Sequence, residues 1–180
     1  RQPAIRVLYN TAVYALGAAA AALTHGHPDG YAPSGVMSLL VRQLIADASW
    51  SESIEAGLAA LTAHPQATGT RSLLVEVLTT VRQGHERSCA SFGQGWVGDE
   101  ALAVGLHAAA TAGSFAAAIE AGSNHDGDSD STASIAGQLY GSKHGLGALP
   151  AGAVYRIDVL EPLLELCREW NRLRRPSSPQ

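Results

Sequence analysis

The chain has 180 residues, of which 46% are hydrophobic and 16% charged, and its formal net charge is −4. This length and composition predict one folded domain with a sizeable core and argue against a disordered chain. The acidic balance argues against a broad nucleic-acid-binding surface, and the apolar stretch at residues 12–23 is shorter than the roughly 20 residues that span a bilayer. We therefore expect neither a nucleic-acid nor a membrane partner.

Hydrophobic residues at helical spacing define the elements of the first half. They predict helices over 4–24 and about 34–47, with a loop at 24–33 between them. Ser51 is the expected N-cap of a third helix, and residues 64–69 read as a loop. A fourth helix is marked by Leu73, Leu74, Val77, Leu78 and Val81.

The second half begins with a long glycine-rich loop at 84–98 and a helix over 99–112. Ser114 is the expected cap of a short helix, which ends at an acidic loop over 122–130. Another helix is expected over 131–143.

A last helix is expected to end near Arg174, with residues 176–180 as a disordered tail. Its inward-facing residues are predicted to be Val159, Leu163, Leu166, Cys167 and Trp170. No alternating β-branched run is long enough for a strand, so the sequence predicts an all-α fold. Cys89 and Cys167 lie far apart without a CxxC pair, which favours a reducing, cytoplasmic location over a zinc or disulfide framework.

The acidic loop is the most informative segment. Asp126, Asp128 and Asp130 alternate and repel one another unless a hard cation such as magnesium, manganese or calcium binds there. An EF-hand is excluded because Ser131 and Gly137 stand where glycine and glutamate are needed. The structural alternative is a turn in which Asp130 or Ser131 caps the next helix. Against that alternative stands a stripe of small residues, which predicts that the helix packs closely inside the protein: Ala133, Gly137 and Gly141.

Two further loops carry candidate binding residues. His25 and His27 are spaced as in some zinc sites, but one of them capping the end of the first helix is a second interpretation. In the glycine-rich loop, Gly95 permits close backbone approach to a ligand. Trp96 either packs against such a ligand or lies in the core.

Three segments resemble the ADP-ribosylglycohydrolase family, which includes the dinitrogenase-reductase-activating glycohydrolases. They are THGHPDGY at 24–31, GQGWVGDEALAVGLHAAA at 93–110 and NHDGDSDSTASIAGQLYG at 124–141. The resemblance implies a compact, orthogonal helical domain. It implies magnesium ligands and residues that contact ADP-ribose, namely Asp128, Asp130 and Ser131 for the metal and His25, Gly95 and Trp96 for the ligand.

The resemblance also implies an activity. It predicts a hydrolase that cleaves the N- or O-glycosidic bond between ADP-ribose and an amino-acid side chain or small aglycone. Two magnesium ions, replaceable by manganese, would form the cofactor. The substrate would be an ADP-ribosylated protein or a small molecule that contains ADP-ribose. The alternatives are a non-catalytic ADP-ribose-binding module and an ion-stabilised helical interaction domain.

Part of the family pattern is absent from this chain. Family members carry a Thr-Asp-Asp motif near the N-terminus, whereas no Asp-Asp pair occurs here. Asp126 stands where the family more often has glycine or serine, so it receives no ligand role. We therefore expect residues 1–175 to be the C-terminal part of one domain. A missing N-terminal half, upstream of Arg1, would supply the general base, and the fragment alone would be inactive.

Overall fold

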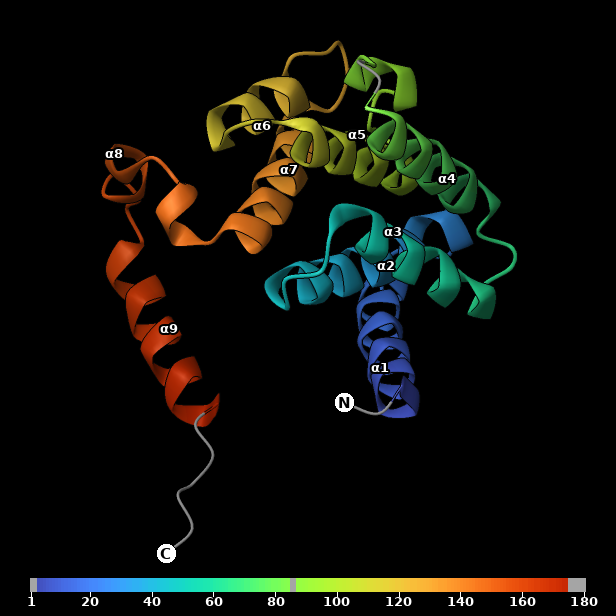
Figure 1. Ribbon diagram of the computed structural model, residues 1–180, viewed down its shortest axis with the longest axis horizontal. Coiled ribbons are helices and arrows are strands. Elements are labelled where there is room, and N and C mark those ends of the chain that lie inside the picture. Colours follow the sequence, from blue (N-terminus) through green and yellow to red (C-terminus); the bar gives the residue numbers. More distant parts are fainter. Residues whose placement is uncertain (1–2, 85–86, 175–180) are drawn as a thin grey trace, which may run out of the picture. The chain divides into compact units, whose positions relative to one another are not determined.

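The computed structural model describes residues 3–84 and 87–174 (Figure 1). Within these residues every regular element is a helix, which confirms the predicted all-α fold. The longer helices are α1 (Pro3–Ala22), α2 (Pro28–Ile45), α3 (Trp50–Ala60), α4 (Thr68–Gln83), α5 (Gly98–Thr111), α6 (Phe115–Ser123), α7 (Ser129–His144) and α9 (Leu160–Arg174). The short ones are η1 (Leu61–Ala63), η2 (Cys89–Phe92), η3 (Leu146–Ala148) and α8 (Ala151–Val154). The chain divides after Ala148 into two compact units.

Two predictions concern the ends of the chain. Arg1, upstream of which the general base is expected, lies outside the described residues, and so does the predicted tail at 176–180. The general base ahead of Arg1 and the disorder of the tail therefore stay predictions.

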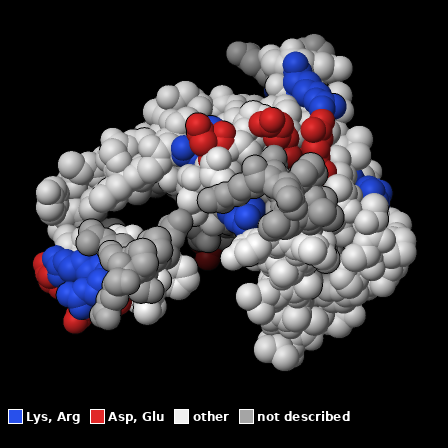
Figure 2. Space-filling model, turned by 60° about the horizontal axis from the view of Figure 1, so that its bottom comes forward, with Lys and Arg blue, Asp and Glu red and all other residues white. Residues whose placement is uncertain are grey.

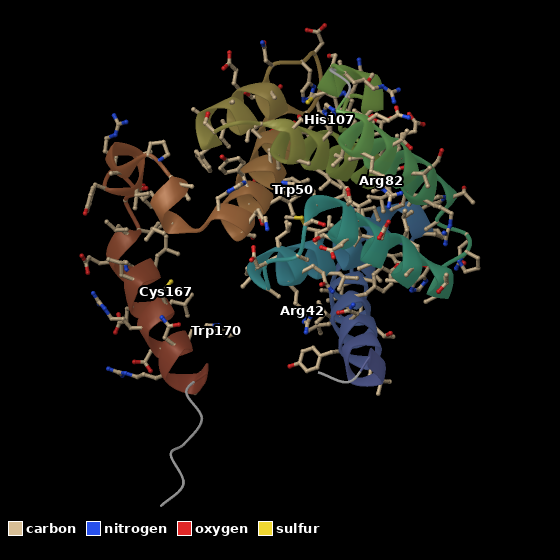
Figure 3. All side chains as sticks on the ribbon, in the orientation of Figure 1. Arg42, Trp50, Arg82, His107, Cys167 and Trp170 are labelled. Atoms are coloured by element: carbon tan, nitrogen blue, oxygen red, sulfur yellow. The ribbon has the colours of Figure 1, made fainter. Side chains whose placement is uncertain are left out.

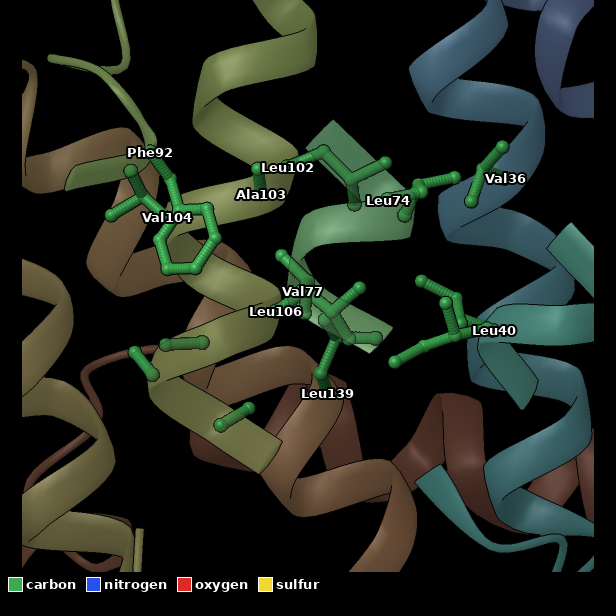
Figure 4. Close-up of a cluster of buried hydrophobic side chains, with 14 of the residues drawn as sticks. Val36, Leu40, Leu74, Val77, Phe92, Leu102, Ala103, Val104, Leu106 and Leu139 are labelled. Atoms are coloured by element: carbon green, nitrogen blue, oxygen red, sulfur yellow. The ribbon is translucent and has the colours of Figure 1, made fainter. Parts of the chain in front are cut away.

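The core of the first unit is built around α5. All residues of α5 from 101 to 109 are buried, as expected for a helix that is apolar on every side. This helix packs against α2, α4, α6 and α7. Figure 4 shows the side chains that fill the space between them, including Val36 and Leu40 from α2, Leu74 and Val77 from α4, Phe92 from η2, and Leu139 from α7.

Helix α1 packs along α2 through small residues. A Cβ atom at Gly17 would lie 2.3 Å from Ser38 Oγ, and one at Gly35 would lie 2.8 Å from Tyr14 Cε2. The two helices can approach this closely only because neither glycine carries a side chain. On other sides of α1, Leu8 and Leu16 are exposed.

Helix α2 begins earlier than the sequence predicts. It starts at Pro28, so the expected loop at 24–33 is only a few residues long. Proline is well suited to the first helical position, where its missing N–H has no partner to lose. His27 is the N-cap, and its Nδ1 accepts a hydrogen bond from Asp29 N at 3.2 Å. The histidine that caps a helix therefore caps the start of α2 and not the end of α1.

Helix α3 is capped by Ser49, so the assignment of Ser51 is wrong. Ser49 Oγ accepts from Glu52 N, and Glu52 Oε2 in turn accepts from Ser49 N at 2.9 Å. This reciprocal pair is a capping box, which requires a glutamate three residues after the serine. The prediction for Ser114 is confirmed, because its Oγ accepts from Ala117 N at 3.1 Å.

Helix α7 starts two residues before the predicted boundary and turns its small-residue stripe towards α6. A Cβ atom on Gly137 would lie 3.0 Å from Ile119 Cδ1 of α6. Ala133, Gly137 and Gly141 are half-buried, whereas the fully buried residues of α7 are Thr132, Ala136, Leu139 and Tyr140. The close packing is confirmed, but the buried face is centred one residue away from the stripe.

The second unit contains the amphipathic helix α9. The prediction that its apolar side chains face inward is wrong, since Val159, Leu163, Leu166, Cys167 and Trp170 are all exposed. Figure 3 shows Cys167 and Trp170 on this helix. The hydrophobic spacing predicted the helix correctly but carries no information about what covers it.

Candidate functional site

The starts of four helices lie close together in the first unit. Asp29, in the first turn of α2, accepts hydrogen bonds from Thr70 N and Thr70 Oγ1 at the start of α4, both at 2.8 Å. A Cβ atom on Gly98, the first residue of α5, would lie 3.3 Å from the carbonyl oxygen of Asp29. The loop before α5 in turn contacts the start of α7 at Asp128. Helix N-termini carry unpaired N–H groups, so this convergence concentrates polar backbone at one place.

Two loops meet at the centre of this region: residues 93–97, here called the glycine loop, and residues 124–128, the acidic loop. Asp128 N donates to Gln94 O at 2.8 Å. A Cβ atom on Gly127 would lie 1.8 Å from Gln94 O, and one on Gly95 would lie 2.7 Å from Thr132 Cγ2. Only glycine fits at either position, so these glycines allow the two loops to touch.

Glu100 anchors the backbone of the glycine loop. Its Oε2 accepts from Gln94 N at 3.0 Å and from Gly95 N at 3.1 Å. Gly93, which has a φ of 118°, leaves the space that this carboxylate occupies, since a Cβ atom there would lie 2.4 Å from Glu100 Cδ. The carboxylate thus accepts hydrogen bonds from two N–H groups of the loop, which lies outside any helix.

The acidic loop is fixed internally by a histidine and a threonine. His125 Nδ1 accepts from Gly127 N at 3.1 Å, so the other ring nitrogen carries the proton and donates. That nitrogen lies 3.1 Å from Gly122 O and 2.9 Å from Thr132 Oγ1. Thr132 Oγ1 is buried and donates to Gly122 O at 2.6 Å. Sequence reasoning singled out neither residue, because apart from their contact with each other their partners are backbone atoms, which no motif reveals.

The proposed metal ligands stand at the start of α7. Asp128 is the N-cap residue, but its side chain makes no capping bond, and it is half-buried. Asp130 and Ser131 are exposed. A hydrogen bond with the Asp128 side chain lowers the pKa of Asp130, and the backbone amides of Asp130 and Ser131 lower it further. The N-cap residue of α7 is Asp128, so neither Asp130 nor Ser131 is its N-cap, although the Asp130 carboxylate does interact with backbone amides of the first turn.

No basic side chain neutralises these two carboxylates in the described part of the chain, whose ion pairs all lie elsewhere. Two neighbouring carboxylates and a hydroxyl form an oxygen donor set of the kind that magnesium prefers. Residues 3–84 and 87–174 contain no group of three His, Cys, Asp or Glu side chains placed to hold an ion. The described residues thus bring two carboxylates together at the start of α7 without a third side chain of these types.

The predicted ligand-contacting residues occupy different environments. Gly95 is buried against Asp128, whereas Trp96 is 66% exposed, so the interpretation of Trp96 as a core residue is wrong. His25 is exposed and lies against the first turn of α2, since a Cβ atom on Gly30 would lie 3.1 Å from the Cβ of His25. A zinc pair of His25 with His27 has no support, because His27 Nδ1 is used to cap α2.

Two aspartates that the sequence did not single out lie in the same region. Burial would raise the pKa of Asp29, but hydrogen bonds from Thr70 and Gly69 lower it below its ordinary value. Burial raises the pKa of Asp99, and the negative charges of Asp29 and Glu100 raise it further. The sequence could have indicated these two residues only as acidic side chains in the first turns of α2 and α5. Such residues usually only interact favourably with the helix dipole.

Two cavities lie away from this region. One has a volume of about 570 Å³ and is lined by residues of α4, of α5 and of the segment between them, including Thr80, Arg87 and His107. The other, of about 670 Å³, is bordered by residues of α2 and α7 that include Leu44 and Lys143. Neither contains a predicted site residue.

The face drawn in Figure 2 shows no single dominant charge. On the face in Figure 2, lysine and arginine side chains form separate groups, and acidic side chains gather near some of them. None of the described helices combines the length and apolar character needed to cross a membrane.

Comparison with known proteins identifies a family. A model of the protein family described as ADP-ribosylglycohydrolase matches residues 2–178. No curated protein and no solved structure matches the chain significantly. The matched range contains both loops of the candidate site and the start of every helix around it.

Proposed function

Since the chain belongs to the ADP-ribosylglycohydrolase family, we propose that it forms the metal-binding part of an enzyme that hydrolyses the glycosidic bond of ADP-ribose. The substrate would be an ADP-ribosylated protein or a small molecule that contains ADP-ribose. The observation that carries the proposal is the contact between the glycine loop and the acidic loop. It places Asp128, a proposed metal ligand, directly against Gly95, a proposed ligand-contacting residue.

The proposed metal ligands are Asp128, Asp130 and Ser131. Bound magnesium, or manganese in its place, would supply positive charge and Lewis acidity to oxygen atoms of the substrate. A binuclear site needs more ligands than these three, because each magnesium ion takes six oxygen donors and releases water reluctantly. We propose that water and residues upstream of Arg1, including the general base, complete the site. Residues 1–175 would then be one part of a larger catalytic domain.

The proposed binding surface for ADP-ribose combines a flat aromatic ring with exposed polar groups. Trp96 presents its ring to solvent next to the metal-binding segment, where an adenine or ribose could pack on it. His25 could hydrogen-bond a ribose hydroxyl through its free ring nitrogen. Thr24 Oγ1 donates to Ala21 O, so His25 Nδ1, 2.8 Å from that oxygen, donates to it and leaves Nε2 as an acceptor for the ligand.

A non-catalytic ADP-ribose-binding module is the second candidate. The observation in its favour is the incomplete coordination shell, because the described residues bring together no third acidic or histidine ligand. Such a module would bind ADP-ribose tightly through this chain alone, whereas an incomplete enzyme would bind it weakly.

The test is calorimetric titration of the 180-residue chain with manganese and with ADP-ribose. We expect weak manganese binding that is lost in Asp128→Ala and in Asp130→Ala. The matched control is Asp126→Ala, which removes a carboxylate of the same loop that we give no ligand role. Equal losses in all three variants would refute the assigned ligands. Micromolar affinity for ADP-ribose would favour the binding module over the enzyme.

Hydrolysis is tested separately with ADP-ribosylated arginine and serine peptides. The intact protein that contains this chain is expected to lose turnover with EDTA and to recover it with magnesium. Turnover that is unaffected by the chelator would contradict the proposed metal mechanism.

A further inference from the structure

We propose that Glu100 is a positioning residue, which sets the place of Asp128 through the backbone of Gln94. The inference rests on the proposed function, because it concerns how a proposed metal ligand is held. Glu100 itself touches neither Asp128 nor any residue of the acidic loop through a hydrogen bond that we observe.

Glu100 bonds to the loop before its own helix and not to the helix start. It is the third residue of α5, the position from which a capping-box glutamate would reach the N-cap residue. Here the N-cap is Val97, and the carboxylate reaches past it to Gln94 N and Gly95 N. Two backbone N–H groups therefore converge on one charged oxygen, an arrangement stronger than two neutral hydrogen bonds.

Gln94 passes this constraint across to the acidic loop. Its N–H is held by Glu100, while its carbonyl oxygen accepts from Asp128 N at 2.8 Å. The backbone of Gln94 is thus hydrogen-bonded on both sides of its Cα, to Glu100 through the N–H and to Asp128 through the carbonyl oxygen. A shift of Gln94 away from Glu100 would move the acceptor of the Asp128 amide with it.

Tight packing leaves the two loops little freedom to compensate. Gly95 lies against Asp128, since a Cβ atom on this glycine would be 3.7 Å from Asp128 Cβ. Gly127 faces Gln94 O with no room for a side chain. Closely packed backbone of this kind transmits displacement, because the interior has almost no free volume to absorb it.

The experiment compares three variants of the full chain by amide hydrogen exchange and by manganese binding. Glu100→Ala removes the acceptor, and Glu100→Gln keeps an oxygen at the same reach. The matched control is Glu52→Ala, which removes a carboxylate that also accepts from a backbone N–H but does so at the start of α3. Comparable losses of stability are expected from Glu100→Ala and Glu52→Ala. A difference between them in Asp128 amide exchange or in manganese binding therefore reflects where the lost carboxylate lies and not the loss of stability.

Glu100→Ala is expected to speed exchange at the Asp128 amide and to weaken manganese binding, each by about tenfold. This ratio corresponds to losing the one hydrogen bond between Asp128 N and Gln94 O. Glu100→Gln should restore most of both properties. Glu52→Ala should leave the acidic loop and the manganese affinity unchanged.

Two outcomes would overturn the inference. If Glu100→Ala loosens only the start of α5 and leaves the Asp128 amide protected, Glu100 acts on its helix alone. If Glu52→Ala weakens manganese binding as much as Glu100→Ala does, the effect is global stability. Failure of the wild-type chain to bind manganese would instead count against the proposed function, and the exchange result would still decide the role of Glu100.

Discussion

A single carbonyl oxygen determines which residue can occupy position 127. The Gln94 oxygen lies where a Cβ atom would have to be, so any other residue would push the acidic loop away from the glycine loop. The clash involves backbone on both sides and cannot be relieved by rotating a side chain. The loop sequence therefore depends on a neighbour that is far away along the chain.

Gly127→Ala is expected to lower the free energy of unfolding by about 1–3 kcal/mol, the usual cost of forcing extra atoms into a packed site. Gly113→Ala is the control, since a Cβ atom there would meet nothing within 4 Å. Thermal melts of both variants provide the measurement. Equal melting temperatures would mean that the two loops are not in contact.

His107 is a buried base on α5. It is only 2% exposed, its Nδ1 lies 3.4 Å from Cys89 Sγ, and it is labelled in Figure 3. Burial and, to a smaller extent, the positive charge of Arg87 together lower the pKa of His107 to about 4. The folded protein thus holds His107 neutral under conditions in which the unfolded chain would protonate it.

This shift predicts that stability falls as the pH falls from the ordinary histidine range towards pH 4. The unfolded state binds a proton first, so the loss is expected to reach about 2 kcal/mol between pH 7.5 and about pH 5. Urea denaturation at several pH values should show this slope in the wild type and a smaller one in His107→Leu. His144→Leu, which removes an exposed histidine, should keep the wild-type slope.

At the scale of helices, the sequence predicted which segments are helical better than it predicted where they start. The period of apolar residues locates a helix body, but the first turn depends on capping chemistry. Pro28 and Gly30 read as loop residues, although proline at the first position and His27 as cap make a sound helix start. Ser49 and Ser51 are equally plausible caps until Glu52 is recognised as the partner of the first.

The two serines provide a direct test of the capping box. Ser49→Ala is expected to cost about 1 kcal/mol of unfolding free energy, because it leaves the first-turn N–H of Glu52 without its acceptor. Ser51→Ala is expected to change it by less than about 0.5 kcal/mol. Chemical denaturation measures both, and the reverse order would place the cap at Ser51.

At the scale of the whole molecule, the sequence predicted the fold class and the family, and both are confirmed. The metal and ligand assignments stay predictions. What the sequence could not reveal are contacts between distant segments, such as Asp29 with Thr70 or Gln94 with Asp128. Both contacts include a hydrogen bond from a backbone N–H, and backbone groups are the same at every position of a sequence.

Exposed apolar residues on α1 predict how the chain behaves in solution. Leu16 is 74% exposed and Leu8 is 72% exposed. Exposed apolar side chains favour association, so the 180-residue chain is expected to self-associate at high concentration. Leu16→Lys should raise the monomer fraction in sedimentation velocity, whereas Val75→Lys on α4 should change it less. A wild-type chain that stays monomeric would contradict this expectation.

The bond between Gln94 and Asp128 also bears on the order in which the molecule is assembled. The two residues are separated along the chain by α5 and α6. Contacts that close such a long stretch of chain lose more conformational entropy than local helical contacts and tend to come last. Interactions that are absent from the folding transition state govern how fast the native state opens and have little effect on how fast it forms. A stronger contact between the two loops is therefore expected to slow unfolding of the site and to have little effect on its folding rate.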